Sequence, residues 1–124
     1  MYKRICLIMT LLSILGNGIS QNSSKFISQS VPDNIQPGET FDISIVFLNT
    51  SSLTWTISGL YHLGSQSPQD NTFWGNTRIN LPNDVAPGNQ VEIKATLTAP
   101  VKEGLYNFQW QMVQDGVEWF GEKS

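Results

Sequence analysis

The chain has 124 residues, with 7 Lys and Arg against 10 Asp and Glu and a formal net charge of −3. That length suits one domain and not two. Nucleic-acid binding needs clustered positive charge, and an acidic chain with scattered basic residues does not provide it, so we expect no nucleic-acid partner.

The first twenty residues, "MYKRICLIMTLLSILGNGIS", have the pattern of a secretory signal. Lys3 and Arg4 precede an apolar stretch from Ile5 to Leu15, and Gly18 and Ser20 are small residues suited to a cleavage site. The apolar stretch is shorter than the roughly 20 residues of a membrane helix. We expect residues 1–20 to be removed and the protein to be secreted or held in the cell envelope. The alternative is an uncleaved anchor, which would keep the protein at a membrane.

The single cysteine, Cys6, lies inside this signal. The exported protein would then contain no cysteine, so its domain must be held together by packing, and thiol catalysis is excluded. Cleavage after Ser20 leaves 104 residues (124 − 20), close to the roughly 100 residues of an immunoglobulin-type sandwich.

The first part of the exported chain alternates apolar and polar residues with a period of two. The stretch "NSSKFISQSVP" predicts a short first strand. After the Pro37-Gly38 turn, the apolar residues Phe41, Ile43, Ile45 and Phe47 predict a strand with one face on the core. Its other face is also apolar near the end, in "SIVFL", which indicates a central position in a sheet.

The rest of the chain continues in short strands. "LTWTISGLYHLGS" and "NTRINLP" predict two more, and "VAPGNQVEIKATLTAP" repeats the Pro-Gly turn followed by alternation. In "LYNFQWQMVQDG" the apolar side chains share one face, and the Asp-Gly pair predicts a hairpin turn. Beyond the signal, no stretch has apolar residues at helical spacing. The pattern predicts an all-β, antiparallel sandwich.

Residues able to support catalysis or bind a metal are few. His62 is the only histidine, so a two-histidine zinc site cannot form within one chain. Glu118 and Glu122 could act as a glycosidase pair, but nothing in the sequence positions them. Asp70 and Asn71 offer only two of the roughly six to eight oxygens that calcium takes, so we interpret them as turn and capping residues. The sequence predicts no enzyme, no cofactor and no metal site.

The tryptophans are more informative. There are four, Trp55, Trp74, Trp110 and Trp119. Trp110 is in phase with the apolar face of its strand and is predicted to be in the core, where an indole N–H needs an acceptor.

Two of the tryptophans, each next to a phenylalanine, could be either buried or exposed for binding. Trp74 follows Phe73 in a loop rich in Gly, Asn and Asp. Trp119 and Phe120 are adjacent, so within a strand one of them must face away from the core. These four residues are therefore either core residues or a binding platform on loops of a rigid scaffold.

The same tryptophans support a family resemblance. From about Val31 to Gly121 the chain resembles the FW ("four-tryptophan") immunoglobulin-like domain, the central domain of the autophagy receptor called "next to breast cancer gene one", and especially its secreted bacterial branch. The matching segments are "NTSSLTW", "YHLGSQSPQDNTFWG", "VAPGNQVEIKATLTAP" and "GLYNFQWQMVQDGVEWFG". The resemblance implies a non-catalytic immunoglobulin-like sandwich of about seven strands over residues 31–124, preceded by a polar segment and first strand at 21–30. It also implies that Trp55, Trp74, Trp110 and Trp119 are structural, with turn or corner positions at Gly88, Gly104, Tyr106 and Gly121.

The end of the chain departs from the family pattern. Members continue past "WFG" into a last strand, whereas only "EKS" follows here, so the resemblance implies that this strand is short or missing. An incomplete sheet would leave an open edge for a protein partner or for self-association.

Three functional hypotheses follow. The first is a secreted protein-binding or assembly module; the alternatives are a carbohydrate-binding module that uses the exposed aromatics and a glycosidase that uses Glu118 and Glu122. Asn22 and Asn49 also fit the glycan-acceptor pattern.

Overall fold

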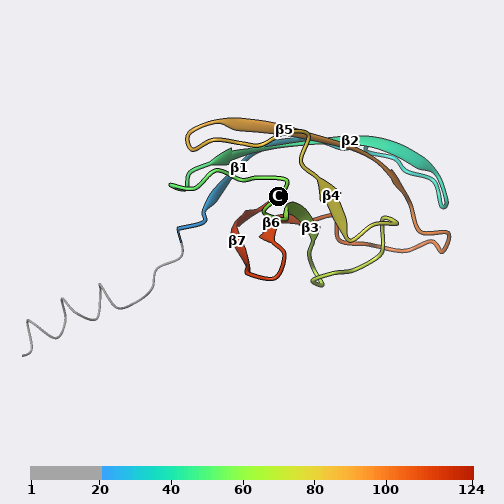
Figure 1. The fold of residues 1–124 in the computed structure, drawn as a ribbon. Coiled ribbons are helices and arrows are strands. Elements are labelled where there is room, and N and C mark those ends of the chain that lie inside the picture. Colours follow the sequence, from blue (N-terminus) through green and yellow to red (C-terminus); the bar gives the residue numbers. More distant parts are fainter. Residues whose placement is uncertain (1–20) are drawn as a thin grey trace, which may run out of the picture.

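The computed structural model describes residues 21–124, so the predicted signal and Cys6 lie outside the described residues. The strands are β1 (Ser24–Ser30), β2 (Thr40–Asn49), β3 (Tyr61–Ser65), β4 (Arg78–Asn80), β5 (Gln90–Thr98), β6 (Trp110–Gln114) and β7 (Glu118–Lys123). They form two antiparallel sheets, β1-β2-β5 and β4-β3-β6-β7. Figure 1 shows the two sheets as stacked layers. The predicted all-β, immunoglobulin-like sandwich is confirmed.

The three-stranded sheet is built around β2, which pairs with β1 on one side and with β5 on the other. Its alternation places Phe41, Ile43, Ile45 and Phe47 in the core. The outer face is half-buried at Val46 and Leu48. The prediction of a central position from this second apolar face is confirmed.

The core between the layers is largely aromatic. Trp55 and Trp110 are fully buried, and Trp74 is 8% exposed. Phe120 packs against Trp55 and Tyr61, with ring centroids 5.8 and 6.1 Å away. The contact with Tyr61 is edge-to-face and the one with Trp55 is tilted. Aromatic pairs at these distances stabilise a core beyond the burial of area alone. Within the described residues, the core therefore closes without the help of a disulfide.

The indole N–H groups differ in how they are satisfied. The Nε1–H of Trp74 donates to the carbonyl of Asn107 at 3.0 Å. Those of Trp55 and Trp110 find no acceptor within residues 21–124. The expectation that a buried indole N–H is paired is therefore confirmed for Trp74, and within residues 21–124 no protein group plays this part for the other two.

Two predicted strands are shorter than expected. Residues 53–60 form turns and one isolated bridge, in which Trp55 and Val85 exchange both backbone hydrogen bonds. Residues 105–109 are not in a strand, although Tyr106 and Phe108 pack against the core as the alternation predicts. Two carbonyls in residues 105–109 accept hydrogen bonds from the Trp74 side chain and the Gln66 backbone. Both donors lie in the irregular β3–β4 connection, so these bonds do not form a strand ladder.

The last strand, expected to be short or missing, is present. "WFG" itself lies in β7, which has 6 residues and pairs with β6, and the Ser124 N–H donates to the Trp110 carbonyl. The outer edge of β7 is not vacant either, because the start of β1 lies against it. The N–H of Phe26 in β1 donates to Oε1 of Glu122 at 2.9 Å. The hairpin ends the sheet, and β1 covers part of its edge.

β1 precedes residue 31, where the predicted domain begins, and is nevertheless part of the sandwich because it pairs with β2 from Ser24 to Ser30. Residues 21–124 contain no helix with the length and apolar character needed to span a membrane.

Candidate functional site

The outer face of the four-stranded sheet has one large aromatic side chain lying across it. Trp119 of β7 points outward, while its neighbour Phe120 is buried. The indole reaches over β3 because Gly64 has no side chain: a Cβ there would come within 2.5 Å of the ring. We call this surface the Trp119 face; its side chains are those of His62, Arg78, Asn80, Gln111, Val113 and Trp119, of which Val113 is buried.

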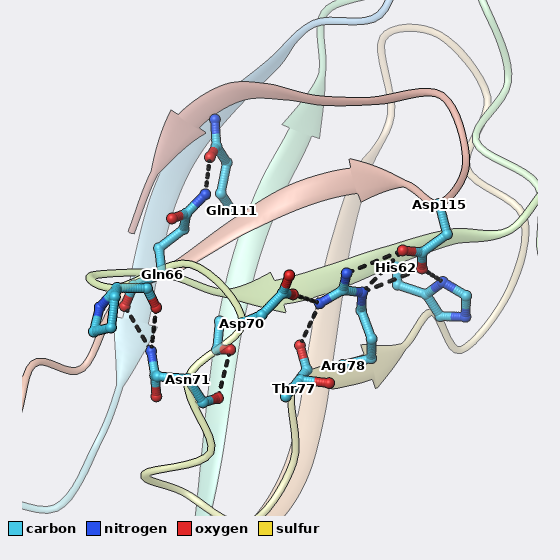
Figure 2. A network of polar contacts seen from close by, with 10 residues as sticks. His62, Gln66, Asp70, Asn71, Thr77, Arg78, Gln111 and Asp115 are labelled. Atoms are coloured by element: carbon cyan, nitrogen blue, oxygen red, sulfur yellow. Dashed lines mark hydrogen bonds and ion pairs between the residues drawn. The ribbon is translucent and has the colours of Figure 1, made fainter.

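Arg78 of β4 lies between Asp70 and Asp115 and makes polar contacts to both (Figure 2). Its guanidinium carbon lies 4.8 Å from the centre of the Trp119 ring, a cation–π distance. Nε and Nη2 donate to the two carboxylate oxygens of Asp115, with Nη2 at 3.0 Å from Oδ1, and Nη1 donates to Asp70 at 2.6 Å. The planar guanidinium is thus fixed by two carboxylates and one ring.

Asp115, in the β6–β7 turn, links this arginine to the histidine of β3. Its Oδ2 lies 2.8 Å from Nδ1 of His62. Hydrogen bonds from Arg78 lower the pKa of the Asp115 carboxyl, and His62 adds to the shift in spite of partial burial. The pKa of Arg78 is raised, because its bonds to Asp115 and Asp70 outweigh the opposing effect of burial.

The lowered pKa has a definite consequence for stability. In the unfolded chain Asp115 titrates near pH 4. In the folded protein the Asp115 carboxylate stays ionised to lower pH. Between the folded-state pKa and the unfolded-state pKa, the unfolded state therefore binds more protons than the folded state. The stabilisation from Asp115 is therefore fully present above about pH 4 and is lost as the pH falls through the folded-state pKa.

The loop between β3 and β4 is ordered by Asn71, which is buried. Its Nδ2 donates to the carbonyls of Gln66 and Pro68, and its Oδ1 accepts from the N–H of Phe73. The interpretation of Asn71 as a turn and capping residue is confirmed. Asp70 lies in the same turn, with a φ of +62°, so its interpretation as a turn residue also holds. In addition it forms an ion pair with Arg78, which the sequence did not predict.

A family model, the Ig-like domain from next to BRCA1 gene, matches residues 30–123, from the end of β1 to the end of β7. The chain belongs to this family. Immunoglobulin-like domains of this kind are typically non-catalytic and serve in general as protein-binding modules. No curated protein matches the chain.

This Ig-like domain does not bring its four candidate binding residues together. Trp74 and Phe120 are 8% and 5% exposed and belong to the core. Phe73 is half-buried, with its ring 5.3 Å from that of Tyr106, at a different place from Trp119. Of the four, only Trp119 lies on the outer face of a sheet, so a shared platform does not form. A binding role for Trp119 stays a prediction.

Other polar candidates of the Ig-like domain are used to hold the fold. Glu118 accepts a hydrogen bond from Asn22 at 2.8 Å, and Glu122 accepts one from the backbone of β1. Both glycan-acceptor asparagines, Asn22 and Asn49, are buried with hydrogen-bonded amides, so a glycan on either would displace those bonds. Within residues 21–124, no three His, Cys, Asp or Glu side chains gather where they could hold a metal ion.

The sequence did not predict a role for Arg78 or Asp115 in a site. Arg78 counted only as one of several scattered cations, and Asp115 only as the first residue of a turn. They are 37 residues apart and meet because β4 and β6 flank β3 on opposite sides. The small residue Gly64 in the middle of a strand was a possible signal, since a glycine there often marks a close approach by another group.

Proposed function

We propose that the chain is a secreted, non-catalytic immunoglobulin-like module that binds a protein partner through its Trp119 face. The observation that supports this most strongly is the contact between Trp119 and Arg78 on a rigid sheet. Trp and Arg are the residue types most often found to dominate the energetics of protein interfaces. Here both are already fixed by the sheet and by two carboxylates, so little side-chain freedom would be lost on binding.

The same contact favours a protein over a sugar as the ligand. A stacking sugar needs a free ring face, and the Arg78 guanidinium already occupies one face of the Trp119 ring. The neighbouring groups, His62 and Asp115, are partly exposed and offer hydrogen bonds at the rim of the aromatic contact. An aromatic centre with a polar surround is typical of protein–protein interfaces.

The absence of catalysis is supported by how the candidate groups are used. Asp115 and Asp70 are both committed to Arg78, and His62 is committed to Asp115. Export is supported by the signal pattern of residues 1–20.

Replacing Trp119 by alanine is expected to weaken partner binding by about 30-fold, the effect of a central interface residue worth roughly 2 kcal/mol. The partner is first isolated on the immobilised chain from the native medium or envelope fraction, and its affinity is then measured by calorimetry. The matched control is Ile27→Ala, which removes a partly exposed apolar side chain from β1 in the other sheet.

Each variant is also unfolded in denaturant, so that lost binding is not confused with lost folding. Equal affinities of Trp119→Ala and Ile27→Ala would contradict the assignment of the face. Retention of the chain on polysaccharides, with no protein partner retained, would favour the carbohydrate-binding alternative.

A further inference from the structure

One strand of the three-stranded sheet has an edge with unpaired backbone groups. β5 pairs with β2 on one side only. Near its end the N–H of Ala99 donates toward β2, to Glu39, whereas the N–H of Thr98 donates the opposite way, to Trp74. Because backbone groups alternate along an antiparallel strand, the N–H and C=O groups of Gln90, Glu92, Lys94 and Thr96 also point away from β2. No hydrogen bond within residues 21–124 uses the outward groups of these four residues.

The side chains along this edge divide cleanly between the two faces. Val91 and Ile93 point into the core and are 4% and 0% exposed. Glu92 and Lys94 point outward, with side chains 53% and 73% exposed, and their charged atoms lie 3.5 Å apart. A hydrogen bond from Ser44 and the charge of Lys94 lower the pKa of Glu92, so its carboxylate is ionised at neutral pH. The edge therefore presents one negative and one positive charge, two residues apart.

This charge order selects one register for pairing with an identical strand. When two copies of β5 pair antiparallel about a two-fold axis, the residues whose backbone groups point away from β2 in one copy must lie opposite such residues in the other. Sliding one strand by a single residue breaks this match, so the allowed registers are two residues apart. An axis at Lys94 would place two lysines opposite each other, and an axis at Glu92 would place two glutamates opposite each other. An axis at Ile93 places Glu92 of each copy opposite Lys94 of the other, and it is also the midpoint of the unpaired stretch from Gln90 to Thr96.

We propose that the protein self-associates through β5, with two copies pairing antiparallel about Ile93 into one continuous six-stranded sheet. Glu92 of each copy then pairs with Lys94 of the second copy, and the two Ile93 side chains meet on the core side. The contact is isologous, so it closes as a dimer and does not extend into a fibre. It uses a different surface from the Trp119 face, which stays free on both copies, so this inference and the proposed function can fail separately.

The experiment is sedimentation velocity of the full chain over a range of concentrations, with charge variants of β5. Lys94→Glu and Glu92→Lys each turn two attractive pairs into two repulsive ones. Each is expected to raise the dimer dissociation constant at least about tenfold. Mixing the two variants is expected to restore association, because the strand with two glutamates then meets the strand with two lysines. The double variant that exchanges both charges is expected to dimerise like the wild type.

Matched controls carry the same charge changes elsewhere: Lys25→Glu on β1 and Glu103→Lys on the β5–β6 connection, both at exposed positions. They are expected to leave dimerisation unchanged. A wild-type chain that stays monomeric, a dimer indifferent to Lys94→Glu, or single variants that do not associate on mixing would each overturn the inference. If the wild-type chain stays monomeric, the charges of Glu92 and Lys94 hinder strand pairing at this edge. If the protein is monomeric but binds its partner through Trp119, the proposed function stands and only the dimer is refuted. If the protein forms the charge-dependent dimer but binds no partner, only the proposed function is refuted.

Discussion

Replacing Asn49 by alanine is expected to lower the free energy of unfolding by about 3 kcal/mol, because the change leaves buried polar groups without partners. Asn49 closes the end of β2 and is fully buried. Its Nδ2 donates to the carbonyls of Leu53 and Val85, each at 2.9 Å. Its Oδ1 accepts from the N–H and the hydroxyl of Ser51. One amide thus joins β2, the following turn and the bridge at Trp55, which holds the fully buried indole in place.

The measurement is the denaturant midpoint at an unchanged slope, which reports stability alone. Asn83→Ala serves as the matched control, since Asn83 also donates from its amide to a backbone carbonyl, but at an exposed site. That control is expected to change the free energy of unfolding by less than about 0.5 kcal/mol. Similar effects of the two substitutions would show that Asn49 does not hold this corner of the fold.

Replacing Gly121 by alanine is expected to destabilise the protein by about 3 kcal/mol, through backbone strain and a steric clash together. Gly121 has a φ of +77°, a conformation that disfavours a Cβ. A Cβ there would also clash with the Ser24 hydroxyl and come within 2.8 Å of the Ser24 backbone nitrogen. The start of β1 would then have to move away from β7.

Gly116 provides the control within the same hairpin. Its φ is +80°, but a Cβ there meets no atom within 4 Å. Gly116→Ala is therefore expected to cost about 1 kcal/mol from strain alone. The difference between the two variants measures the contact of β1 with β7. Equal losses would mean that β1 does not lie against β7 in solution.

The strands of the fold were predictable where the alternation was strong. In β2 and β5 the period of two gave both the strands and their core faces, and the apolar second face of β2 indicated its central position. The pattern failed around Trp55 and Tyr106, where aromatic side chains reach the core from irregular backbone. Apolar alternation reports which side chains are buried. It does not report whether a neighbouring strand is present to pair with the backbone.

The candidate site was less predictable, because it depends on the order of strands in the sheets. Because Trp119 and Phe120 are consecutive residues of one strand, the prediction that one of them faces outward was correct. The sequence could not say which of the two it is. Arg78 reaches Trp119 only because Gly64 leaves the space between them open. The open edge was expected beside the final hairpin, but the structure places β1 there; within residues 21–124, the side of β5 that faces away from β2 has no partner strand.

The central claim is that the outer face of the four-stranded sheet, centred on Trp119, is the surface that binds a protein. The most direct test places a photo-crosslinking amino acid at Asn80, an exposed position on this face, or at Lys25, an exposed position on the other sheet. We predict that the partner protein is captured from Asn80 and not from Lys25, and that Trp119→Ala strongly reduces this capture. Capture from Lys25 alone, or capture from Asn80 that is unaffected by Trp119→Ala, would contradict the claim.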